Sequence, residues 1–129
     1  MACKKIVFVI VEGPSDETAL GTVLNRLYNN NEVFVRVMHC DITSDNRIEP
    51  DKIVINVCDV VKSYAGQVLK SKDFKEIIHI VDMDGAYAPD NCIVEEADAE
   101  KVFYTTKEMR TNKVQKIKER NNHKRQCLE

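Results

Sequence analysis

Continuous hydrophobic runs alternate with helically spaced hydrophobic residues along the first two thirds of the chain. The first run, residues 6–11, contains only β-branched and aromatic residues, which is typical of a strand buried on both faces of a parallel sheet. Gly13 and Pro14 end this run, and Ser15 is expected to cap a helix. The buried face of that helix is expected to carry Leu20, Val23, Leu24 and Leu27.

A strand, a helix and another strand are predicted next. Residues 33–37 have the composition of a short strand, Pro50 marks the start of a second helix, and residues 77–81 form another apolar strand. The second helix is expected to bury Ile53, Val57, Val60, Val61, Tyr64 and Val68. This alternating order predicts a parallel α/β sheet with right-handed crossovers.

The hydrophobic pattern weakens after residue 85. Residues 92–94 and 102–104 are interpreted as short strands. From residue 107 onward apolar residues are sparse, which indicates either a solvated helix or a segment whose packing partner is missing. We therefore expect one α/β domain over residues 1–106, with a sheet of about four mainly parallel strands flanked by helices. Residues 107–129 would form a basic C-terminal tail or helix.

Composition narrows the class of protein. The chain has 129 residues, 43% of them hydrophobic and 31% charged, as expected of one small globular domain. Its apolar runs fall far short of the roughly 20 residues that cross a membrane, and its start does not resemble a secretion signal. The five cysteines are scattered without a CxxC pair, which argues against a zinc site and a secreted disulfide framework. These features predict a cytoplasmic protein with no membrane partner.

Charge is unevenly distributed along the chain. The net charge is −2, yet the segment from Lys107 to Arg125 holds eight Lys or Arg and only two Glu. This segment is expected either to follow a nucleic-acid backbone through its phosphates or to form a solvated face. The nucleic-acid interpretation assigns phosphate contacts to Lys113, Lys116, Lys118, Arg120, Lys124 and Arg125.

Acidic residues follow two of the predicted strands. Glu12 comes directly after the first strand, and Asp82 and Asp84 come after the third. Ligands of parallel sheets bind outside the carboxyl ends of the strands, where these carboxylates would converge. Crowded carboxylates favour a hard divalent cation such as Mg²⁺ or Mn²⁺. The structural alternative is capping of turns and helices, and Asp16 in a first helical turn fits that alternative equally well.

Two motifs together resemble a known family. The stretch Val11-Glu12-Gly13-Pro14-Ser15-Asp16 and the later stretch Val81-Asp82-Met83-Asp84-Gly85 are similar to the two motifs of the Toprim domain. That domain occurs in topoisomerases, bacterial primases, ribosomal-RNA maturation nucleases and OLD-family nucleases of anti-phage systems. The resemblance covers residues 4–105 and implies a Rossmann-like, mainly parallel sheet.

The resemblance also implies roles for individual residues. Glu12 would act as the general acid or base in phosphodiester chemistry and would also contact the metal. Asp82 and Asp84 would hold Mg²⁺ or Mn²⁺, and Asp16 would help to organise the site or a second metal. Gly13 and Gly85 would keep backbone bulk away from the metal and the phosphate.

A metal-dependent nuclease acting on DNA or RNA is the activity that best fits these features. Strand passage by a topoisomerase needs a longer chain, and a primase needs a zinc module that the Cys and His spacing does not provide. Phage defence follows only by analogy with related nucleases. A non-catalytic nucleic-acid-binding or regulatory module is the alternative. A flavodoxin-like nucleotide-binding protein is disfavoured because the chain has no Gly-rich phosphate loop. Besides nucleic acid, the alternative partners are a second copy of the chain and an additional domain.

Other reactive side chains are assigned mainly to packing. His39, near Asp41, is interpreted as a strand-end residue, with a metal-ligand or general-base role as the alternative. His79 lies inside an apolar run and is expected to be packed in the core. Cys40 and Cys58 are expected to be unreactive thiols.

Overall fold

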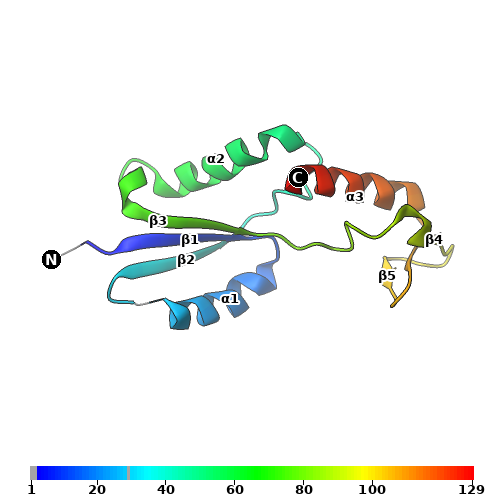
Figure 1. Cartoon of the computed structure of the whole chain (residues 1–129), viewed down its shortest axis with the longest axis horizontal. Coiled ribbons are helices and arrows are strands. Elements are labelled where there is room, and N and C mark those ends of the chain that lie inside the picture. Colours follow the sequence, from blue (N-terminus) through cyan, green and yellow to red (C-terminus); the bar gives the residue numbers. More distant parts are fainter. Residues whose placement is uncertain (1–2, 29) are drawn as a thin grey trace. The chain divides into compact units, whose positions relative to one another are not determined.

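The computed structural model describes residues 3–28 and 30–129, which form two compact units (Figure 1). Unit 1 comprises Met1–Ile42 and Lys52–Asp82, and unit 2 comprises Thr43–Asp51 and Met83–Glu129. The chain therefore leaves unit 1 for a nine-residue segment, returns to it, and enters unit 2 finally after Asp82.

Unit 1 is built on a three-stranded parallel sheet. Its strands are β1 (Lys5–Val11), β2 (Val33–His39) and β3 (Phe74–Ile80), in the order β2-β1-β3. The central strand, β1, is buried along nearly its whole length, as its unbroken run of apolar residues predicts. All three strands run in the same direction, so the residues that follow them lie at one edge of the sheet.

Two helices cover opposite faces of this sheet (Figure 1). Helix α1 (Pro14–Leu27) packs Leu20 and Leu24 against the face that carries Val7, Val9 and Val11. Helix α2 (Ile53–Ala65) lies on the other face, where the rings of Phe8 and Tyr64 have centroids 4.6 Å apart. The alternation of side chains along β1 thus supplies one core layer to each helix.

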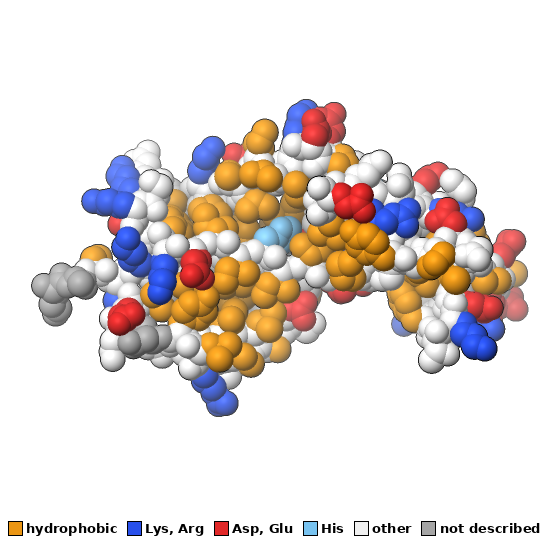
Figure 2. Space-filling model, in the orientation of Figure 1, with side chains coloured by type: hydrophobic (Ala, Val, Ile, Leu, Met, Phe, Trp, Pro, Cys, Tyr) orange, Lys and Arg blue, Asp and Glu red, His pale blue; other side chains and the backbone are white. Residues whose placement is uncertain are grey.

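The helices are less buried than their sequence pattern predicts. In α1, Leu20 and Leu24 pack on the sheet, whereas Val23 and Leu27 are exposed. In α2 the buried residue is Val61, and Val68 is exposed beyond the helix end. A three-stranded sheet is only about 10 Å across its outer strands, so it contacts a narrower stripe of each helix than the apolar spacing implies. Figure 2 shows the resulting hydrophobic side chains exposed over the strands and helices of unit 1.

The start of α1 also differs from the expectation. Gly13 is the N-cap and Pro14 occupies the first helical turn, so the expected cap at Ser15 is wrong. Proline suits this position because it lacks the amide hydrogen that the first turn of a helix leaves unpaired. Short 3₁₀ turns precede three of the other elements: Pro50–Lys52, Ser71–Asp73 and Asp90–Cys92.

Unit 2 combines a small mixed sheet with a helix. Strands β4 (Ile93–Glu95), β5 (Phe103–Tyr104) and β6 (Met109–Thr111) have the order β4-β6-β5, with β4 parallel and β5 antiparallel to β6. Helix α3 (Val114–Leu128) contributes Ile117 to a core that contains Ile93 and Met109. The basic segment is therefore helical from Val114 onward, with one side of the helix packed within unit 2.

The α/β class and the parallel sheet flanked by helices are confirmed. The parallel sheet has three strands where about four were expected, because the later short strands of the described chain pair with one another in unit 2. Strand β6 was not predicted, since Met109 is followed by the polar pair Arg110 and Thr111. Within the described residues, no helix has the length and apolar character needed to cross a membrane.

Candidate functional site

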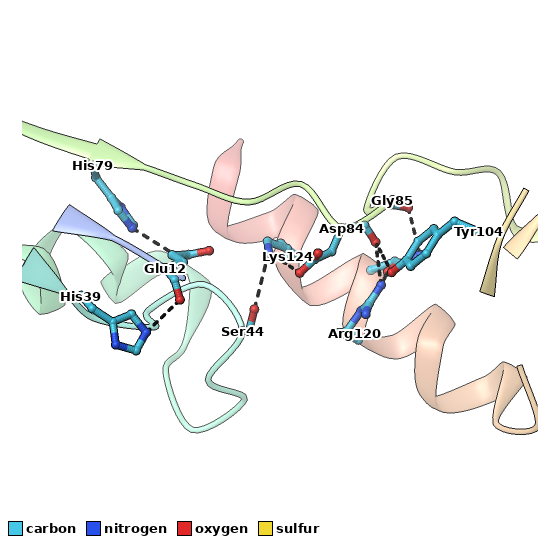
Figure 3. Close-up of polar contacts among 10 residues, drawn as sticks. Glu12, His39, Ser44, His79, Asp84, Gly85, Tyr104, Arg120 and Lys124 are labelled. Atoms are coloured by element: carbon cyan, nitrogen blue, oxygen red, sulfur yellow. Dashed lines mark hydrogen bonds and ion pairs between the residues drawn. The ribbon is translucent and has the colours of Figure 1, made fainter. Parts of the chain in front are cut away.

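Glu12 stands at the carboxyl end of β1 with its carboxylate almost enclosed. The side chain is 4% exposed, and its Oε1 lies 3.4 Å from Nε2 of His79 on β3 (Figure 3). The His79 side chain is 16% exposed, and its Nε2 forms no hydrogen bond within the described structure. The contact therefore has the distance of an ion pair without the directionality of a hydrogen bond. A carboxylate and an imidazole face each other at the edge where parallel sheets bind ligands.

The register of the sheet explains this contact. Ile10 on β1 is paired with His79 on β3, so their side chains share one face of the sheet. Glu12 follows Ile10 by two residues and returns to the same face by the alternation of an extended chain. The apolar run around His79 predicts a core residue and does not reveal this contact with Glu12. The sequence feature that could have indicated this contact is the position of His79 near the end of a strand expected to lie in the same parallel sheet as the strand before Glu12.

His39 holds the main chain of Glu12 from the other neighbouring strand. It is the last residue of β2, and its Nε2 lies 2.9 Å from the Glu12 main-chain oxygen (Figure 3). A carbonyl oxygen only accepts, so Nε2 carries the hydrogen that is donated. The Cys40 amide donates in the same way to the Val11 carbonyl at 2.8 Å. These two bonds extend the β1–β2 pairing beyond the strands and fix the backbone that carries Glu12.

Negative charge and burial act on Cys40 at this edge. Burial raises the pKa of the Cys40 thiol above its usual value, and the charges of Asp41 and Glu12 raise it further. The thiol consequently stays protonated at neutral pH, in keeping with the expected lack of reactivity. The same interaction places the Glu12 charge within electrostatic reach of the Cys40 thiol.

Gly13 and Asp16 form the turn that follows Glu12. The Asp16 amide donates to the Gly13 carbonyl at 3.2 Å, and a Cβ on Gly13 would lie 2.7 Å from Oδ2 of Asp16. The missing side chain of Gly13 thus makes room for the Asp16 carboxylate. Asp16 stands in the first turn of α1, where the helix dipole favours an acidic residue.

Asp82 follows β3 and is exposed, so unit 1 carries Glu12 and Asp82 after two adjacent parallel strands. Asp84 belongs to unit 2, and the three expected metal ligands are therefore divided between the units. Carboxylate oxygens are the donors that Mg²⁺ prefers. The described residues nevertheless contain no group of three or more His, Cys, Asp or Glu placed to hold a metal ion.

Within unit 2, Asp84 and Gly85 occupy a strained turn. Both have positive φ, +46° at Asp84 and +71° at Gly85. A Cβ on Gly85 would lie 2.9 Å from Sδ of Met109 and 3.3 Å from a ring carbon of Tyr104. Gly85 is thus required by its backbone conformation and by its neighbours in unit 2, two constraints that are separate from the expected clearance for a metal and a phosphate.

The six basic residues assigned to nucleic acid have different surroundings. Lys113 and Lys116 are exposed and Lys118 is partly exposed. Arg120 and Arg125 are partly buried and donate to main-chain oxygens, those of Asp84 and Ala86 respectively. Lys124 is buried, which does not fit the expectation that it contacts a phosphate backbone. The burial of Lys124 was not predictable, because a lysine in a segment with few apolar residues is expected to be solvated.

A surface groove in unit 2 runs along α3. It has a volume of about 830 Å³ and brings together Lys116, Arg120 and His123 with the polar side chains of Ser44 and Asn46. Glu119 also lines it, so the charge of the groove is mixed.

Comparison of the chain with protein-family models, curated proteins and solved structures gave no match. The Toprim assignment stays a prediction based on the motif that follows β1 and the motif that follows β3.

Proposed function

We propose that this chain carries out metal-dependent phosphodiester chemistry on nucleic acid, as a Toprim nuclease in which Glu12 is the general acid or base. The observation that carries the proposal is the Glu12 carboxylate, 4% exposed and 3.4 Å from His79. A proton-transfer group must be held in one orientation near the reacting atoms. The contact with His79 and the His39 bond to the Glu12 main chain provide that orientation.

The chemistry of Glu12 in this proposal is a proton transfer. Its carboxylate would take a proton from an attacking water molecule or return one to the leaving sugar oxygen. The position after β1 supports this role, because ligands of parallel sheets are bound at that edge. Asp16, in the following turn, would help to order the site.

The expected cation is Mg²⁺ or Mn²⁺, held by Asp82 and Asp84 with a contribution from Glu12. Oxygen donors suit both ions, and this chemistry of the side chains is what supports the choice. When bound, the cation would neutralise charge on the phosphate.

A cleavage assay tests the proposal. Purified protein would be incubated with supercoiled DNA, single-stranded DNA and structured RNA in Mg²⁺ or Mn²⁺. We expect Glu12→Gln to lower the cleavage rate at least about 100-fold, the usual contribution of a general acid or base. Glu32→Gln is the matched control, because Glu32 is an exposed glutamate of unit 1 away from the sheet edge. Equal cleavage by wild type and Glu12→Gln, both folded, contradicts the proposal.

A nucleic-acid-binding module without catalysis is the second candidate. It is favoured by Lys113 and Lys116, exposed on unit 2, and by the groove that contains Lys116, Arg120 and His123. Such a module would bind labelled DNA or RNA equally well as wild type and as Glu12→Gln, with affinity falling as salt rises and without cleavage in either form. Fluorescence anisotropy measured beside the cleavage assay separates the two candidates.

A further inference from the structure

Lys124 of α3 is a buried cation beside the second aspartate of the Asp82-Met83-Asp84 motif. Its side chain is 1% exposed, and Nζ lies 3.5 Å from Oδ2 of Asp84 and 3.5 Å from Oγ of Ser44 (Figure 3). Lysine is almost never fully buried unless its ammonium is paired. Lys124, Asp84 and Ser44 all belong to unit 2.

The rest of α3 fixes the turn on which Asp84 stands. Arg120 donates from a terminal guanidinium nitrogen to the Asp84 main-chain oxygen at 2.8 Å. Asn121, itself fully buried, donates to the Gly85 oxygen at 3.2 Å, and Arg125 donates to the Ala86 oxygen at 3.2 Å. Three consecutive carbonyl groups are thus bound by one helix. This network holds a non-glycine residue at positive φ and keeps the Asp84 carboxylate beside Lys124.

The Asp84 carboxylate has two different sides. One oxygen faces the buried ammonium, while the side chain as a whole is 43% exposed and is reachable from solvent. A divalent cation arriving from solvent would meet a carboxylate whose charge is already balanced at close range. The ammonium and the metal would also repel each other, and burial weakens the screening of that repulsion by water.

We propose that Lys124 is the built-in counter-ion of Asp84 and that it weakens the affinity of this residue for divalent cations. The inference rests on the proposed function, in which Asp84 is a metal ligand. It adds Lys124 as the residue that sets the metal affinity of Asp84. Lys124 is thus a positioning residue that sets how strongly Asp84 attracts a metal, with no contact to substrate.

Titration with Mg²⁺ alone, followed by the amide NMR signals of Asp84 and Gly85, tests the inference. We expect Lys124→Met to bind Mg²⁺ at least about tenfold more tightly than wild type, because a nearby positive charge is removed. Lys101→Met is the matched control, since Lys101 is exposed in unit 2 and its loss changes the net charge equally. Equal affinities for wild type and Lys124→Met, or no saturable shift in Lys124→Met, overturn the inference.

A second measurement does not require the Lys124 variant to fold. Asp84→Asn removes the negative charge that lies 3.5 Å from the buried ammonium, so we expect a lower Tm than wild type. Asp98→Asn, at an exposed aspartate of unit 2, is expected to leave Tm unchanged. If both variants melt alike, Asp84 is not the counter-ion of Lys124. Neither readout uses nucleic acid. Failure of the nuclease proposal would appear only in the cleavage assay, so it can be distinguished from failure of the inference about Lys124.

Discussion

The imidazole of His79 on β3 faces the carboxylate of Glu12 after β1, with 3.4 Å between Nε2 and Oε1. The two side chains meet because the parallel register pairs Ile10 with His79 and the alternation of β1 returns Glu12 to the same face. A residue that the hydrophobic pattern assigns to the core is therefore a polar neighbour of the proposed proton-transfer group.

Replacing His79 by leucine is expected to lower the free energy of unfolding by about 1–2 kcal/mol, since it removes a polar neighbour from a nearly buried carboxylate. Chemical denaturation of His79→Leu, Glu12→Gln and the double variant measures the coupling between the two side chains. We expect a coupling of at least about 0.5 kcal/mol. Strictly additive effects would show that the contact contributes nothing to stability.

The turn at Gly85 predicts a difference between two glycine substitutions. Gly85→Ala places a side chain at φ +71° and 2.9 Å from Sδ of Met109, whereas Gly66→Ala has φ +56° and no neighbouring atom within 4 Å. Both variants bear the backbone cost of positive φ, about 1–3 kcal/mol. Gly85→Ala has in addition a steric cost of about 1 kcal/mol because Met109 must move. Urea unfolding checks this, and equal losses would remove Met109 as a constraint.

The ion pair between Asp45 and Arg47 predicts how the stability of the fold changes in acid. Hydrogen bonds from Arg47 hold the pKa of Asp45 at about 2, below its usual value of 3.8. A folded pKa below the unfolded one means that this stabilisation is present above pH 3.8 and is lost as pH falls through about 2. Arg47→Gln should move the NMR titration midpoint of the Asp45 carboxyl up toward 3.8. An unchanged midpoint would show that Arg47 is not the cause.

The core of unit 1 follows directly from the sequence. Phe8 and Val9 lie in a run that is apolar at every position, and only a strand covered on both faces buries such a run completely. Helix burial is harder to derive, because the spacing of Leu24 and Leu27 shows which side of α1 is apolar but not how much sheet it meets. The width of the sheet depends on strand pairing over long sequence distances.

The position of Glu12 at the carboxyl end of β1 was predictable, whereas its neighbours were not. Glu12 is identified by its place after a recognisable strand, whereas His79 becomes its neighbour only through the register between β1 and β3. Asn121 and Lys124 are buried on α3 although both are polar. Their partners are carbonyl and carboxylate groups of distant turns, which leave no mark on hydrophobic periodicity.

The division of the chain has a consequence for the order in which the protein is made. All strands of unit 1 have been synthesised once Ile80 is reached, but the segment from Thr43 to Asp51 belongs to unit 2. In the complete fold, the main-chain oxygen of Ile48 in this segment lies 2.8 Å from Nε2 of His123. This contact forms only after His123 has been synthesised. During translation the sheet of unit 1 can therefore fold first. The segment from Thr43 to Asp51, which connects two parts of unit 1, can pack in its final place only after α3 has left the ribosome.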